Sequence, residues 1–238
     1  MNNSSRMLFQ ISFLILCSAQ YTISVPTSKT TRTTSAPLTT SILENEFLSK
    51  VMHAIPHEKI TEIANAHLKS DENFQAAVKY LQNETFLDLM ETIEKKPEWT
   101  AFRNIVKEDT GLDISSVFKC VVNFLRSVKV DGTGTAERSF KPFIMDVFKE
   151  IPFPNIMAEL NSKENASKFE ELYNKMSSAH TKKIVANLIH LPEVKKFLDS
   201  INDMDLKVYD LLAFIFGFLK WGEIQIPSTY ETLLVQLS

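Results

Sequence analysis

The feature of this sequence that most constrains its fold is a set of landmarks that occurs twice, about 95 residues apart. Ile151-Pro152 follows Ile55-Pro56 after 96 residues. The other pairs, 94 to 96 residues apart, are Ile60 and Ile156, Pro97-Glu98 and Pro192-Glu193, Phe102 and Phe197, Leu112 and Leu206, and Leu125 and Leu219. Landmarks that agree in order and to within two residues predict an internal duplication.

Each copy reads as a series of short helices. Ser41-Ile42-Leu43-Glu44 has the form of a capping box, so a first helix is expected to run from there to about Ala54, before Pro56. Apolar residues then recur at helical spacing. The expected start signals of the next helices are Ser70 or Asp71, Asn83, Pro97 and Asp113. About six helices per copy follow from this pattern.

Two later positions carry specific expectations. Gly111 supplies a left-handed helix stop in the first copy, and Asp205 replaces it in the second, where aspartate tolerates that conformation better than most residues. The stretch 211–219 is apolar on all sides but too short to span a membrane, which predicts a buried central helix. Ser228-Thr229-Tyr230-Glu231 predicts a short C-terminal helix.

Composition supports an all-α fold, because only five glycines occur in 238 residues. The net charge of −3 gives no broad electrostatic footprint for nucleic acid, so no nucleic-acid partner is expected. The expected organisation is a signal peptide at 1–19 with its end between 19 and 25, a Ser/Thr/Pro-rich linker at 26–41, helical repeat 1 at 42–130, a connecting loop at 131–138, helical repeat 2 at 139–222, and a C-terminal helix or tail at 223–238.

The N-terminal segment is typical of a secreted chain. Arg6 precedes the apolar run Met7 to Cys17, and the small residues Ser18 and Ala19 follow. An uncleaved anchor is the alternative, but about 11 apolar residues are too few to cross a bilayer. Removal of this segment leaves Cys120 as the single cysteine, so no internal disulfide is expected.

No catalytic or metal-binding constellation is visible. His53 and His57 are four residues apart, but Pro56 interrupts their helix. Cys120 is expected to be a buried, inert thiol beside Val121 and Val122. A nucleophile elbow is absent, and no phosphate-loop lysine follows the two glycines of the connecting loop. We therefore predict no catalytic residue, no metal ligand and no enzymatic activity.

Two glycosylation sequons lie in the repeats. They are Asn83-Glu84-Thr85 and Asn165-Ala166-Ser167. Both asparagines are candidate glycosylation sites in a secreted chain, and a simple helix cap is the alternative role for Asn83.

The first copy resembles the insect allergen-related repeat family. The resemblance lies in Phe74-Gln75-Ala76-Ala77-Val78-Lys79-Tyr80-Leu81, in Pro97-Glu98-Trp99 with Phe102, and in Gly111-Leu112-Asp113 before an apolar helix. It covers residues 43–222 as one duplex of two repeats. The second copy matches less closely, since Phe169, Leu172 and Met176 replace the Phe74 stretch. The family includes the major cockroach allergen, midgut microvillar proteins and nitrile-specifier proteins.

The resemblance implies that the two repeats form a single helical shell around a large apolar cavity, filled with fatty acid or phospholipid rather than a catalytic cofactor. The residue pattern alone favours a solid core. The candidate cavity-wall residues are Ile60, Ile63, Phe74, Val78, Leu81, Phe86, Leu89, Ile93, Phe102, Val117, Val121, Phe124, Ile156, Phe169, Leu172, Met176, Ile184, Leu188, Phe197, Leu211, Ile215 and Phe218.

The expected function is that of a lipid-binding protein of the insect midgut. It would be a monomer secreted into the gut lumen or onto the microvillar surface. Exchange of lipid with membranes, and with it membrane-lytic or antiviral activity, is a possible extension. The alternatives are a nitrile-specifier-like detoxification protein and a structural or protective protein of the gut microvillar surface.

Overall fold

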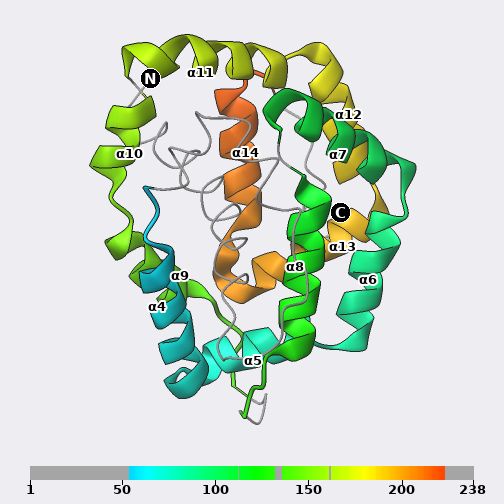
Figure 1. The fold of residues 1–238 in the computed structure, drawn as a ribbon. Helices are drawn as coiled ribbons and strands as arrows, with labels where there is room; N and C mark the ends of the chain where they lie inside the picture. Colours follow the sequence, from blue (N-terminus) through cyan, green and yellow to red (C-terminus); the bar gives the residue numbers. More distant parts are fainter. Residues whose placement is uncertain (1–53, 112, 132–135, 161, 223–238) are drawn as a thin grey trace, which may run out of the picture.

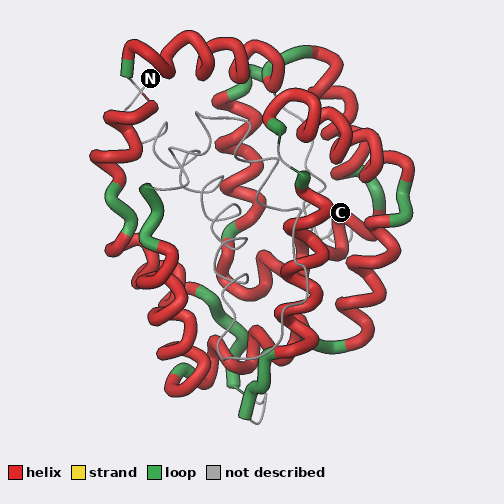
Figure 2. The backbone as a smooth tube through the Cα atoms, in the orientation of Figure 1, coloured by secondary structure: helices red, strands yellow, loops and turns green. Residues whose placement is uncertain are grey.

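The structure, a computed structural model, describes residues 54–222 except 112, 132–135 and 161. Within these residues the chain is helical and contains no strand, which confirms the predicted all-α fold (Figure 2). The predicted signal peptide, the linker, nearly all of the first helix and the C-terminal tail lie outside the described residues. None of the helices described is both long and apolar enough to cross a membrane.

The helices are assigned to the two predicted copies by their positions in the sequence. Those of the first copy are α4 (His57–Ser70), α5 (Glu72–Leu81), α6 (Glu84–Glu94), α7 (Pro97–Thr110) and α8 (Ile114–Ser127). Those of the second are α9 (Lys141–Glu150), α10 (Phe153–Leu160), α11 (Lys163–Met176), α12 (Ala179–Ile189), α13 (Pro192–Ile201), the irregular turn η1 (Asn202–Leu206) and α14 (Val208–Phe218). In Figure 1, most helices lie around the periphery, while α8 and α14 run through the middle of the view.

The predicted capping residues start their helices. The Asp71 Oδ1 atom accepts the backbone N–H groups of Asn73 and Phe74, both at 3.0 Å. The Oδ1 atoms of Asn83 and Asp113 each accept the N–H two residues further on, at 2.9 and 3.1 Å. Each side chain satisfies backbone donors that have no partner inside the helix. These starts are therefore fixed by local sequence.

The two Ile-Pro landmarks adopt the same local geometry. The His57 N–H donates to the Ile55 carbonyl oxygen at 2.9 Å, and the Phe153 N–H donates to the Ile151 carbonyl oxygen at 2.8 Å. A left-handed residue also recurs, with φ of 75° at Gly111 and 62° at Asp205. Matching positions thus share a backbone conformation, which supports the duplication. The number of helices per copy remains a prediction.

The copies interlock through their middle helices, because α7 packs against α12 and α6 packs against α13. Since α12 corresponds to α6 and α13 to α7, one type of contact is made twice. Polar and aromatic interactions join α13 to the first copy. Lys96 Nζ lies 2.6 Å from Glu193 Oε1, and the Phe86 and Phe197 rings stack with their centroids 5.6 Å apart.

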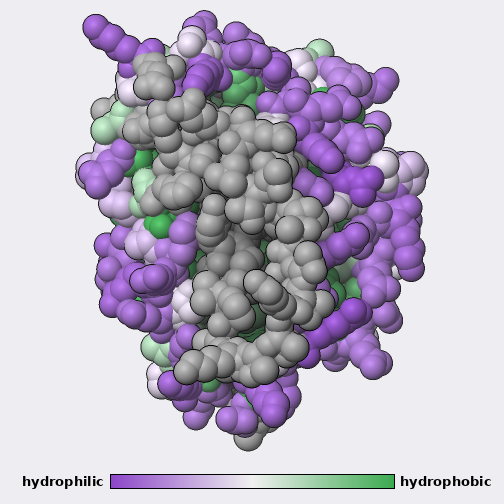
Figure 3. All heavy atoms as spheres, in the orientation of Figure 1, coloured by the Kyte–Doolittle hydropathy of each residue, from purple (hydrophilic) through white to green (hydrophobic). Residues whose placement is uncertain are grey.

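Helix α14 is central in the fold but is only partly buried. Phe216 is its one fully buried residue. Asp210, Ala213 and Gly217 are exposed, and their spacing of three and four residues places them on one face. The prediction of a helix buried on all sides is therefore wrong for this face. Elsewhere the described surface shown in Figure 3 is mainly hydrophilic, with small separate hydrophobic areas.

Candidate functional site

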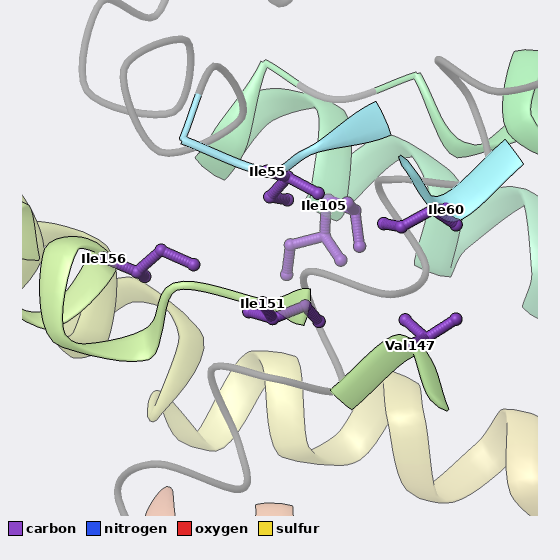
Figure 4. Packing of buried hydrophobic residues seen from close by; sticks show 7 residues of the cluster. Ile55, Ile60, Ile105, Val147, Ile151 and Ile156 are labelled. Carbon is purple, nitrogen blue, oxygen red and sulfur yellow. The ribbon is translucent and has the colours of Figure 1, made fainter. Parts of the chain in front are cut away.

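The apolar helix faces meet in four clusters. The isoleucine cluster consists of Ile55, Ile60, Ile105, Val106, Val147, Ile151 and Ile156. Its members come from both copies, and Figure 4 shows the isoleucines of the two Ile-Pro landmarks lying close to Ile105 and Val147. Burial of each such side chain stabilises the fold by roughly 1.5–3 kcal/mol. The cluster therefore packs the two copies against each other.

The Phe74 cluster consists of Phe74, Ala77, Val78, Leu87, Leu125, Phe140 and Met204. The Phe74 and Phe140 rings meet edge to face with their centroids 5.3 Å apart. Only 5% of Phe74 and 3% of Val78 are exposed. The apolar face of α5, which carries the family-like stretch, is therefore packed against protein in this structure.

Of two further clusters, the Trp221 cluster belongs to the second copy and the Leu89 cluster joins the two copies. The Trp221 cluster consists of Val185, Ile189, Phe216, Leu219 and Trp221, and the Leu89 cluster consists of Leu89, Ile93, Leu188 and Val194. Phe102 packs against both of them and also against the isoleucine cluster, yet it stays half-buried. It is the residue at which three apolar clusters meet.

The structure divides the candidate wall residues into two groups. Those that are fully buried are Ile60, Phe74, Val78, Phe86, Leu89, Ile93, Ile156 and Leu188. Those that are half-buried are Ile63, Leu81, Phe102, Val121, Phe124, Phe169, Leu172, Met176, Ile184, Phe197, Leu211, Ile215 and Phe218. The Val117 side chain is outside the description. Fully buried side chains offer little surface to a ligand, so the half-buried group is the candidate lipid-contacting surface.

A pocket of about 540 Å³ opens between α7 and α12. Its lining residues are Ala101, Asn104, Ile105, Glu108, Asp109, Lys175, Ser178, His180, Thr181 and Ile184. Partial burial raises the pKa of Asp109, Glu108 raises it further, and the charges of Lys175 and His180 oppose the rise. No sequence motif connects the end of α7 with the start of α12, so this site was not predictable from the sequence.

A second pocket, of about 550 Å³, lies beside α6 and the end of α8. Its residues are Gln82, Glu84, Leu87, Asp88, Leu125, Arg126 and Val128. Gln82 Nε2 donates to the carbonyl oxygens of Leu125 and Val128, each at 2.7 Å. Both pockets are open to solvent and neither is the enclosed apolar cavity that the resemblance implies, so that cavity remains a prediction.

The two sequons differ in access. Asn83 is exposed at the start of α6, whereas Asn165 lies in α11 with 0% of its surface exposed. A glycan cannot be accommodated on a side chain that neighbouring atoms enclose completely. The burial of Asn165 disfavours its modification in the folded protein, and glycosylation of Asn83 and of Asn165 both remain predictions.

No catalytic or metal centre stands out in the part of the chain that the structure describes. There, no three histidine, cysteine, aspartate or glutamate side chains come together as metal ligands. His53, one of the paired histidines, and the Cys120 side chain lie outside the description.

A family model described as insect allergen related repeat, nitrile-specifier detoxification, matches residues 43–212, which is more than half of the chain. The match extends from before α4 into α14. No curated protein and no solved structure matches the chain.

Proposed function

The chain belongs to the insect allergen-related repeat family, and from this premise we propose that it is a lipid-binding protein that carries fatty acids or phospholipids among its apolar helix faces. The observation that carries the proposal is the position of Phe102. A phenylalanine that touches three apolar clusters would be fully enclosed in a close-packed core. Phe102 instead keeps accessible surface.

The apolar surroundings of Phe102 suit an acyl chain. Met176, Ile215 and Phe218 are half-buried against the Trp221 cluster, and Phe169 and Ile184 are half-buried against the isoleucine cluster. Burial of a methylene contributes about 0.8 kcal/mol, so an acyl chain gains enough to offset its own ordering. The sulfur of Met176 adds an adaptable contact.

The proposal includes the setting in which such a carrier would work. We propose that the protein is secreted into the gut lumen or onto the microvillar surface as a monomer, and that it exchanges lipid with membranes. Exchange requires the helices to separate, since nearly every large apolar side chain on the described surface is at least half-buried and Met145 is the exposed exception.

A pair of methionine variants tests lipid binding in this region. Protein stripped of lipid is titrated with cis-parinaric acid, and its fluorescence is followed in the wild type, Met176→Trp and Met145→Trp. Met176 lies against the Trp221 cluster, whereas Met145 is 52% exposed on α9. We expect Met176→Trp to fill space and reduce binding severalfold, and Met145→Trp to bind like the wild type. Equal binding by both variants would contradict this location.

A second candidate function is detoxification chemistry, which the description of the family model names. The observation in its favour is the α7–α12 pocket, where a partly buried carboxyl with a raised pKa lies among charged neighbours. Incubation with glucosinolate breakdown products tests it. Turnover that is lost in Asp109→Asn would support this function, and no turnover by the wild type would remove it.

A further inference from the structure

His67 forms a hydrogen bond through each of its ring nitrogens, and the bond from Nε2 reaches the second copy. Nδ1 lies 2.7 Å from Asp71 Oδ2, and Nε2 lies 3.2 Å from Asp146 Oδ2. Asp71 is the cap of α5, and Asp146 belongs to α9 in the second copy. The side chains of His67 and Asp71 are 12% and 17% exposed, whereas that of Asp146 is 44% exposed, so water competes weakly for the bond to Asp71 and more strongly for the bond to Asp146.

Aromatic rings hold the imidazole in place. The Phe74 ring centroid lies 5.6 Å from that of His67, and the Phe143 ring meets it edge-on at 5.8 Å. Phe74 and Phe143 are themselves 4.9 Å apart. The ring therefore has little freedom to turn away from its two carboxylates.

The charged groups around the ring come from the two elements packed against α4. Asp71 faces it from the start of α5, and Asp146 faces it from α9. Lys149 acts on the ring only through Asp146, because the Lys149 Nζ atom lies 2.6 Å from the Asp146 Oδ1 atom. The hydrogen bond from Lys149 lowers the pKa of Asp146 most, and the hydrogen bond with His67 lowers it further.

The number of protons on His67 decides how many of these bonds can form. An imidazolium has two N–H groups and donates to both carboxylates, whereas a neutral imidazole has one. The shorter bond, to Asp71, lies within the first copy and is favoured to keep that proton. The Nε2 lone pair then faces the Asp146 carboxylate, and the contact between the copies becomes repulsive.

We propose that His67 is a proton-operated clamp, which holds α4 against α9 when its ring is charged and releases this seam between the copies when the ring is neutral. The clamp goes beyond lipid carriage and does not depend on it. It acts on the contact between α4 and α9, whereas the hydrogen bond to Asp71 and the cap of α5 remain in both states.

Hydrogen exchange across the titration of His67 tests the clamp. Imidazole ¹⁵N shifts give the titration of His67 in the full protein, and amide exchange, corrected for its intrinsic pH dependence, is measured from pH 5 to 9. We expect amides of α4 and α9 to lose protection roughly tenfold as the ring becomes neutral, since a hydrogen bond to a charged group is lost. Amides of α12 and α13 serve as the internal reference.

Two variants separate the clamp from general destabilisation. Asp146→Asn can accept from the charged ring or donate to the neutral one, so it should abolish the pH dependence while keeping the helices folded. His190→Gln removes an exposed histidine that bonds only within α12, and it should leave the pH dependence unchanged. Protection in α4 and α9 that stays constant as His67 titrates, or that keeps its full pH dependence in Asp146→Asn, would overturn the proposal.

Discussion

Gly111 and Asp205 hold the same left-handed backbone conformation at matching points of the two copies, with φ angles of 75° and 62°. Glycine adopts this conformation without steric cost, whereas aspartate does so at some cost. Asp205 gains a hydrogen bond in return, because the Ser139 Oγ atom donates to its Oδ2 atom at 2.7 Å. The second copy thus keeps the turn without its glycine.

This relationship predicts the relative effects of three substitutions to alanine or glycine. Gly111→Ala should lower the free energy of unfolding by about 1–2 kcal/mol, because a Cβ atom is forced into the left-handed region. Both variants of Asp205 lose the hydrogen bond from Ser139, but only glycine relieves the strain of the left-handed backbone. Asp205→Gly should therefore change the free energy of unfolding less than Asp205→Ala. Urea denaturation measures all three. Equal effects of the two Asp205 variants would contradict the strain argument.

The two sequons should be used unequally. In protein secreted by insect cells, we expect a glycan on Asn83, which is exposed, and none on Asn165, which is fully buried. Peptide mass spectrometry before and after glycosidase treatment measures both. Asn83→Gln should remove the mass difference. A glycan on Asn165 in folded protein would show that α11 does not pack as described.

The Lys96–Glu193 pair should make stability depend on acid pH. The hydrogen bond from Lys96 lowers the pKa of Glu193. The contribution of the pair is therefore present above the pKa of an unfolded glutamate and is lost as the pH falls through the lower pKa of the folded state. Thermal unfolding between pH 6 and 2.5 should show a smaller loss of stability in Lys96→Met than in the wild type. A parallel loss in both proteins would argue against this pairing.

Tyr209 should resist alkaline titration. It donates a hydrogen bond to Asp199, and burial together with that bond raises its pKa. Since the folded state favours the protonated phenol, its stabilising effect is complete below the pKa of an unfolded tyrosine and is lost as the pH rises above it. In an absorbance titration at 295 nm up to pH 11, Tyr209→Phe should leave the amplitude unchanged. A decrease by one tyrosine would contradict the buried bond.

The parts of the fold that were predictable from sequence depend on local interactions. Asp71, Asn83 and Asp113 cap their helices by bonds that span two or three residues, so a short window of sequence contains both partners. The left-handed Asp205 followed from the spacing between the copies. These features fixed helix starts and the order of elements.

The features that were missed depend on packing between distant segments. His67 and Asp146 are 79 residues apart, and no pattern links them. The pocket between α7 and α12 also arises only when the copies interlock, and the burial of Asn165 depends on packing around α11 that its local sequence does not show. For the same reason, the apolar pattern could not separate fully buried residues such as Phe74 from half-buried ones such as Phe102.

Extraction of bound lipid tests the central claim most directly. Protein secreted by insect cells is purified without detergent, extracted with organic solvent and examined by mass spectrometry, and its folded state is checked by circular dichroism before extraction. We predict fatty acid or phospholipid in at least equimolar amount, retained in Met145→Trp and reduced in Met176→Trp. A helical, cooperatively folding protein that contains no lipid and takes none up would contradict lipid carriage.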